Sequence, residues 1–236
     1  MTQLTKLEPD EITKLENTFN EYITAKTSSA LSTLFSESIF HKVKILDDGI
    51  CNIKETKIPD DEIKMCGISL NGKGDTHIEI CYTIKIKYAK KIAAKLLDQP
   101  IDELDDLSTS AIQEVANIMT GSFFNAMSSC TGFRVELSTP DFAKGELPSL
   151  VSVCAKNIAN PIDTVVITDA EFVGEESGIK IHMMILQDIL HIRELLKHQN
   201  SKNSVEKHEE EYFIGGQNSE LDSLVEDALK EEKHAS

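Results

Sequence analysis

The sequence predicts an α+β domain with pseudo-two-fold symmetry, in which long helices cover a mostly antiparallel sheet. Three observations support this fold class. Segments with helical periodicity alternate with short runs of β-branched and apolar residues. Turn-forming residues separate these runs, and the order helix, strands, helix occurs twice along the chain. The repetition indicates an internal duplication.

In the first half of the chain, a helical pattern extends from Pro9 to about Phe35, and a proline is well tolerated in the first helical turn. Strand-like runs follow at 42–46, 63–70 and 77–86. The turn-rich sequence NGKGDT between the last two runs predicts a hairpin. A short helix over 88–99 is ended by Pro100.

The second half repeats this outline. A long helix over about 106–130 ends at Gly132, as expected for a glycine that follows a helix C-terminus. The sequence then predicts strands at 133–138, 150–156, 163–172 and 178–186. A final helix covers 188–198, and the predicted domain of residues 1–198 ends with it.

The C-terminal region differs from this domain in composition. Residues 199–218 are polar, charged and glycine-containing, which predicts a flexible acidic linker. Residues 219–232 regain a helical period and predict a short amphipathic helix. Its apolar face consists of Leu221, Leu224, Val225 and Leu229, with Ala228 between them.

The charge and cysteine content narrow the range of functions. The chain has 40 acidic and 24 basic residues and a formal net charge of −16, which disfavours binding to nucleic acids and to anionic membrane surfaces. Its five cysteines are scattered and form no CxxC motif, a pattern typical of reduced thiols. No apolar run approaches the length of a membrane span, and the N-terminal residues are polar. We therefore expect a cytoplasmic protein with no membrane insertion.

The long helix carries a row of polar groups. Ser110, Glu114, Asn117 and Gly121 fall within roughly 60° of one another on a helix. An apolar face lies opposite and consists of Ile112, Val115, Met119, Phe123 and Ala126. We expect this apolar face to pack on the sheet and the polar row to face solvent. The spacing alone is typical of an ordinary solvated helix face.

The residues around this row resemble the signature of the CheC/CheX/FliY family of CheY-phosphate phosphatases. In that family an Asp or Ser is followed after three residues by Glu, after two more by Asn, and after twenty-two more by Pro. The matching residues here are Ser110, Glu114, Asn117 and Pro140. The resemblance covers about residues 10–198 and is closest to CheC.

The resemblance implies a phosphatase that hydrolyses the aspartyl phosphate of a CheY-like response regulator in chemotaxis. Asn117 would orient the attacking water, and Glu114 would pair with a lysine of the regulator. Ser110 and Gly121 would contact the regulator, and Pro140 would shape the chain near the site. The regulator would supply Mg²⁺, so the resemblance implies no cofactor of the chain's own.

Many CheC and FliY proteins carry a second copy of the signature on the first helix, and this chain departs from it. Glu16 and Asn20 are spaced i, i+4 rather than i, i+3, and Ile12 stands where the signature has Asp or Ser. No proline follows at the expected distance. We therefore expect one catalytic site.

The segment 219–232 has two interpretations. It either packs on the domain or stays disordered, or it is a tethered peptide that captures the regulator. CheY-binding peptides in chemotaxis are similarly short, acidic and amphipathic, and ELDSLVEDAL resembles them. A tether would raise the effective concentration of the regulator near the site.

The sequence also offers a candidate metal site and two alternatives to the enzyme. His191, Glu194 and His198 share a helix face, but a charged, exposed face explains them better than a metal site. The fold could serve as a non-catalytic adaptor that binds a CheD-like deamidase or the regulator. It could also be a structural part of the flagellar switch, because the FliM middle domain resembles this fold.

Overall fold

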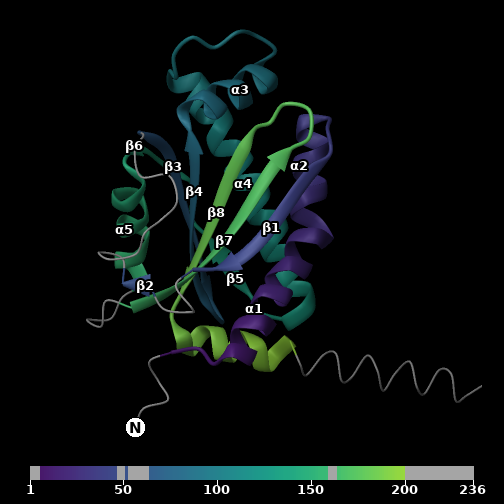
Figure 1. The fold of residues 1–236 in the computed structure, drawn as a ribbon, viewed down its shortest axis with the longest axis vertical. Helices are drawn as coiled ribbons and strands as arrows, with labels where there is room; N and C mark the ends of the chain where they lie inside the picture. The colour runs from purple at the N-terminus through teal and green to yellow at the C-terminus, as the bar shows by residue number, and fades with distance from the viewer. Residues whose placement is uncertain (1–5, 47–50, 53–63, 159–163, 200–236) are drawn as a thin grey trace, which may run out of the picture. The chain divides into compact units, whose positions relative to one another are not determined.

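An antiparallel sheet with the strand order β1-β7-β8-β4-β3-β5 forms the centre of the structure (Figure 1). Outside this path, β2 pairs with β7 and β6 pairs with β3. The strands are β1 (Ile39–Ile45), β2 (Cys51–Asn52), β3 (Met65–Gly74), β4 (His77–Lys85), β5 (Val135–Leu137), β6 (Asp141–Gly145), β7 (Thr164–Gly174) and β8 (Lys180–Gln187). This computed structural model describes residues 6–46, 51–52, 64–158 and 164–199.

The helices of the described residues lie largely where the sequence predicts them. They are α1 (Pro9–Tyr22), the π-helical turn η1 (Ile23–Thr27), α2 (Ser28–Phe35), α3 (Ile86–Leu97), α4 (Asp106–Thr131), α5 (Leu147–Ile158) and a last helix over 189–199. The first three follow one another without a break, as the single helical pattern indicates. Gly132 ends α4 in the left-handed region, with φ 78°.

The predicted duplication is confirmed by the strand order. The order reads the same from both ends when β1 is matched with β5–β6, β7 with β3, and β8 with β4. Each half begins with a long helical segment, α1–α2 in the first and α4 in the second, and ends with a pair of long strands followed by a helix. The strands β4 and β8 meet at the centre, where Tyr82 lies opposite Met183.

One prediction about the second half is wrong, and one strand was not predicted. The run 150–156 is helical and belongs to α5, whose buried residues Leu147, Leu150, Val151, Cys154 and Ala155 repeat at helical intervals. Its two valines favour a strand locally. The helix forms nevertheless, because it places all five apolar residues on the one face that packs on the sheet. The short strand β6 was not predicted, because only one of its residues, Phe142, packs against the core.

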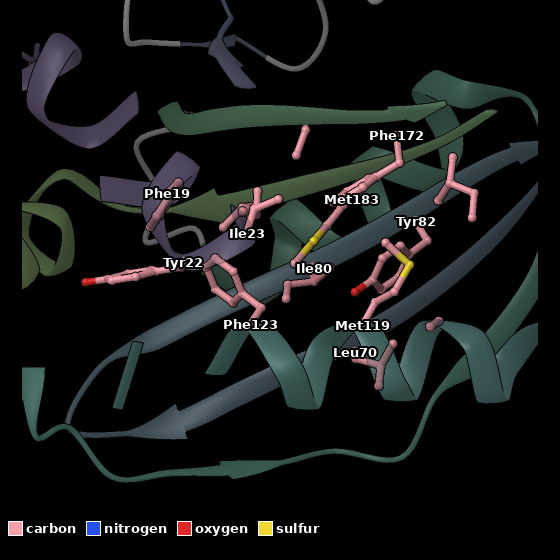
Figure 2. Packing of buried hydrophobic residues seen from close by; sticks show 14 of the residues in the cluster. Phe19, Tyr22, Ile23, Leu70, Ile80, Tyr82, Met119, Phe123, Phe172 and Met183 are labelled. Atoms are coloured by element: carbon pink, nitrogen blue, oxygen red, sulfur yellow. The ribbon is translucent and has the colours of Figure 1, made fainter. Parts of the chain in front are cut away.

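The two faces of the sheet have separate cores. On one face α1, α2 and α4 pack against the strands, and Phe123 of α4 meets Phe19 and Tyr22 of α1 edge to face at ring-centroid distances of 5.5 and 5.8 Å (Figure 2). On the other face α5 covers β3, β4 and β8, where its Cys154 belongs to a smaller apolar cluster with Cys81. The larger core therefore lies directly beneath the polar row of α4.

The described part of the chain ends at Gln199. Its Oε1 accepts a hydrogen bond of 2.8 Å from the buried Tyr22 hydroxyl, and contacts divide the chain between residues 1–199 and 200–236. The rest of the predicted linker 199–218 and the predicted helix 219–232 lie outside the described residues, as do Leu221, Leu224, Val225 and Leu229. None of the helices within the described ranges is both long and apolar enough to cross a membrane.

Candidate active site on helix α4

The start of α4 is fixed by a reciprocal pair of hydrogen bonds. Asp105 is the N-cap residue, and its Oδ1 accepts from the backbone N–H of Ser108 at 2.9 Å. The backbone N–H of Asp105 donates in return to Ser108 Oγ at 2.8 Å. The Ser108 hydroxyl also donates to Asp105 Oδ1 at 2.6 Å, and this hydrogen bond, together with that from the Ser108 N–H, holds the pKa of Asp105 below its usual value. Such a capping box sets where the helix begins.

The predicted orientation of α4 is confirmed. The five residues of the apolar face, Ile112, Val115, Met119, Phe123 and Ala126, are all buried. Ser110, Glu114 and Asn117 are exposed, and Gly121 is partly exposed. The polar row therefore lies on the outer surface of a helix whose other face is fixed in the core.

A buried hydrogen bond attaches α4 to the sheet close to this row. The hydroxyl groups of Thr120 on α4 and Tyr82 on β4 lie 2.9 Å apart, and both residues are inaccessible to solvent. Burial raises the pKa of the Tyr82 phenol well above its usual value, so this group stays protonated. The contact fixes the rotation of the helix one turn after Asn117.

Pro140 contacts the same helix from the edge of the sheet. It lies between β5 and β6, both of which pair with β3, and a proline fits such an interruption because it has no N–H to donate. Its carbonyl oxygen accepts a hydrogen bond of 3.0 Å from Nε2 of Gln113. The last residue of the signature is thus connected to the neighbour of Glu114. Gln113 was not predicted, because its partner is 27 residues away in the chain.

The members of the polar row differ in their own contacts. Ser110 Oγ donates to the backbone carbonyl of Asp106 at 2.8 Å and thus bonds within the helix. Among the described residues, Glu114 and Asn117 have no side-chain hydrogen bond or ion pair. A Cβ at Gly121 would meet no atom within 4 Å, so the packing of the chain itself does not require glycine there.

Leu107 extends the row at its N-terminal end. This side chain is 56% exposed, although it is large and apolar. It lies one turn before Ser110 and two turns before Glu114, on the same side of the helix. Sequence reasoning missed this residue, although its spacing of seven residues from Glu114 gave the signal.

The corresponding pair on α1 is bound to the domain itself. Oε1 of Glu16 accepts a hydrogen bond of 2.8 Å from the backbone N–H of Ile45 on β1. Oδ1 of Asn20 lies 3.2 Å from Nε2 of His41, also on β1. In the first half, Glu16 and Asn20 attach α1 to the edge strand β1. In the second half, Gln113 attaches α4 to the chain between β5 and β6. Glu114 remains available as a result, whereas Glu16 does not.

The two histidines of the last helix each lie beside a carboxylate that is close to them in the chain. His191 Nδ1 lies 2.5 Å from Asp188 Oδ2, and His198 Nε2 lies 3.4 Å from Glu194 Oε1. The described ranges contain no group of three or more His, Cys, Asp or Glu side chains that could hold a metal ion.

Comparison with known families identifies one match on the same helix. Residues 107–143, which contain all of α4 except Asp106, β5 and the start of β6, match the CheC-like family. The CheY-P phosphatase CheC of Bacillus subtilis is 21% identical over 134 residues, which are 54% of this chain and 64% of that protein. The chain thus spans slightly less than two thirds of this curated relative.

Two solved structures share the fold. FliY of Thermotoga maritima superposes with a TM-score of 0.61 at 16% identity, over 83% of this chain and 98% of that one. The FliM middle domain of H. pylori gives a TM-score of 0.53 at 10% identity, over 81% of this chain and 99% of that one. At these identities the two structures establish the fold alone. The chain is thus similar to the CheC-like family on α4, and it shares the fold of FliY and of the FliM middle domain.

Proposed function

We propose that this protein is a phosphatase that hydrolyses the aspartyl phosphate of a CheY-like response regulator. The proposal rests mainly on one observation. Glu114 and Asn117 are exposed on α4 without side-chain partners among the described residues, whereas the corresponding Glu16 and Asn20 are engaged by β1. A carboxylate and an amide one turn apart on a rigid helix are well placed to act on a group held by another protein.

In this proposal Asn117 orients the attacking water. A carboxamide has both a donor and an acceptor, so it can hold one water molecule in a fixed direction without acting as a base. The water oxygen forms a bond to phosphorus while the bond to the regulator's aspartate oxygen breaks, which yields inorganic phosphate and a free carboxylate. Phosphoryl transfer depends chiefly on positioning and on charge stabilisation, so an oriented water can be sufficient.

Glu114 would fix the docking geometry. Its carboxylate would pair with the lysine beside the phosphoryl group of the regulator, which also brings its own Mg²⁺. A charge pair enclosed by two protein surfaces is stronger than an exposed one. The contacts between Thr120 and Tyr82 and between Gln113 and Pro140 support this step, because they limit movement of the helix that carries Glu114.

Two non-catalytic functions compete with the phosphatase. The domain could act as an adaptor that binds a CheD-like deamidase or the regulator without turnover, or as a component of the flagellar switch. The fold does not separate these functions, because FliM has it too. The exposed amide favours the enzyme, since a binding surface has no particular need for Asn117 beside Glu114. The acidic helix predicted at 219–232 would add a second contact with the regulator in either case.

The test is phosphate release from a phosphorylated CheY-type regulator, measured with the wild type, Asn117→Ala and Glu114→Ala. We expect Asn117→Ala to lower the catalysed rate about a hundredfold or more while the regulator still binds. We expect Glu114→Ala to weaken both rate and binding. Asn125→Ala is the matched control, because Asn125 is an exposed asparagine of α4 outside the signature.

The proposal fails if the wild-type protein binds the phosphorylated regulator and leaves the phosphate lifetime unchanged. That experiment should include a CheD-like protein, so that a missing activator does not explain the result. Equal rates for Asn117→Ala and Asn125→Ala would also contradict it, because the amide would then have no special role.

A further inference from the structure

The sheet face opposite α4 is covered only in part among the described residues. The helix α5 packs over β3, β4 and β8. Charged residues lie on the same face beyond it, where Lys42 and Lys44 of β1 stand opposite Glu171 and Asp169 of β7. His182 of β8 continues the first of these rows. In Figure 1, β7 and β8 lie in front of α4. This region is therefore on the other side of the sheet from the proposed catalytic row.

These residues form a cavity with a volume of about 410 Å³, which we call the lysine cavity. Four lysines line it, from three different strands: Lys42, Lys44, Lys85 and Lys180. The ring of Tyr88 on α3 and the His182 imidazole complete the wall. A volume of this size is typical of sites for small molecules.

Glu171 and Asp169, the two carboxylates of the lysine cavity, each lie close to two of the basic side chains. Glu171 accepts a hydrogen bond of 3.0 Å from Lys180 Nζ, and His182 Nε2 lies 3.9 Å away. Asp169 is only 2% exposed, and its carboxylate lies 3.0 Å from His182 Nδ1 and 3.9 Å from Lys44 Nζ. The hydrogen bond from Lys180 lowers the pKa of Glu171, and the charges of His182 and Lys44 add to this effect.

The composition of the lysine cavity differs from that of an ordinary ion-paired sheet surface. Cross-strand pairs would be balanced by equal numbers of opposite charges, but the described lining of this cavity contains four lysines and two carboxylates. Among the described residues, no carboxylate oxygen lies within 4.0 Å of Lys42 Nζ. This positive excess is found in a chain with a net charge of −16.

We propose that the lysine cavity binds a small phosphate-bearing molecule, with Lys42 and Lys44 as the main contacts to the phosphate oxygens. Lysine ammonium groups are compact charges that suit phosphate. The carboxylates of Asp169 and Glu171 hold His182 and Lys180 in place around the cavity. The phosphate belongs either to a free anion or to a nucleotide whose base lies against Tyr88. The site does not depend on the proposed phosphatase activity, because it shares no residue with the row on α4.

Titration calorimetry of the full chain with pyrophosphate and with ADP, both without Mg²⁺, tests this proposal. The variants are Lys42→Gln and Lys44→Gln. We expect each to weaken binding about tenfold, as is typical for the loss of one hydrogen bond between charged groups. Lys26→Gln is the control, because Lys26 is an exposed lysine on η1 outside the lysine cavity. It should bind like the wild type.

Three results would overturn the proposal: no binding of either probe to the wild type at millimolar concentration, equal affinities of wild type and cavity variants, or equal losses in Lys26→Gln and Lys42→Gln. Tighter binding of ADP would support the nucleotide source, and equal binding would support a free anion. Thermal melting checks folding. If Lys44→Gln unfolds because Asp169 loses a partner, the exposed Lys42 still decides the test.

Discussion

Nε2 of Gln113 donates a hydrogen bond of 3.0 Å to the carbonyl oxygen of Pro140. This contact joins the helix that carries Glu114 to the interruption between β5 and β6. The contact gives a physical reason for a proline at a fixed distance from the Glu–Asn pair. Pro140 interrupts the edge of the sheet, and its backbone carbonyl accepts the hydrogen bond from α4.

Replacing Gln113 by Leu should loosen the helix at the site. We expect the free energy of unfolding to fall by about 1 kcal/mol, the typical value of one hydrogen bond. Phosphate release should slow more than regulator binding weakens, because the water held by Asn117 would be less well aligned. Urea denaturation, a binding titration and the release assay measure the three quantities. A variant that loses stability and keeps its full rate would show that the contact does not position the site.

Replacing Gly121 by Ala should separate folding from binding. The added Cβ meets no atom within 4 Å, and alanine is a better helix former, so we expect the variant to gain about 0.5–1 kcal/mol in stability. The same methyl group would keep the regulator's surface away from α4 and weaken its binding. Asn125→Ala adds a helix-favouring alanine one turn after Gly121 and serves as the control for helix propensity. Unchanged affinity in Gly121→Ala would mean that the regulator does not approach this position closely.

Replacing Leu107 by Ser should weaken regulator binding about tenfold, since an exposed apolar anchor typically contributes 1–2 kcal/mol at an interface. Little stability should be lost, because 56% of the side chain is already exposed. Leu190→Ser is a matched control, with a leucine that is 63% exposed on the helix over 189–199. Equal effects of the two substitutions on binding would exclude Leu107 as a specific contact.

The pair on α1 should matter for stability alone. Glu16→Ala removes the acceptor for the Ile45 N–H, so we expect a loss of about 1 kcal/mol in stability. The rate of phosphate release should stay at the wild-type value, in contrast to Glu114→Ala. A comparable loss of activity in the two variants at a temperature where both are folded would instead indicate two active sites.

Glu37 should make stability depend on pH under acidic conditions. Burial of its side chain opposes ionisation, but the backbone N–H groups of Ser177 and Glu176 and the Lys95 ammonium donate to the carboxylate and lower its pKa from 4.5 to about 2. The stabilisation is therefore present above about pH 4.5 and is lost as the pH falls towards 2.

The size of this contribution is on the order of 3 kcal/mol. The difference in unfolding free energy between wild type and Glu37→Gln should be largest at neutral pH and should shrink as the carboxylate is protonated. Urea denaturation at a series of pH values measures this difference. A constant difference from pH 7 to pH 3 would contradict the assigned pKa.

The orientation of α4 could be predicted because two patterns agree. Its apolar residues repeat at helical intervals and the signature residues lie opposite them, so burial of Met119 and Phe123 already implied exposure of Asn117. Gly132 marked the end of the helix by its backbone freedom. The fold class followed from the repeated order of elements. These features depend on local sequence, and local sequence was sufficient for them.

The wrong and missing predictions depend on contacts between distant residues. In α5 the valines favour a strand locally, and only packing on Cys81 and its neighbours reveals the helical stripe. The edge strand β6 has little buried surface of its own. The contact of Gln113 with Pro140 and the capture of Glu16 by β1 join residues 27 and 29 positions apart. Neither contact produces a periodic pattern in the sequence from which it could be predicted.

The strand order has a consequence for how the chain folds. The strand β1 belongs to the first half but pairs with β7 of the second, and β5 and β6 belong to the second half but pair with β3 of the first. The two halves thus exchange their outer strands, as the subunits of a domain-swapped dimer do. Neither half can complete its sheet alone, so we expect this unit to unfold in a single cooperative transition. Its many pairings between remote segments must form together, so we expect it to fold slowly.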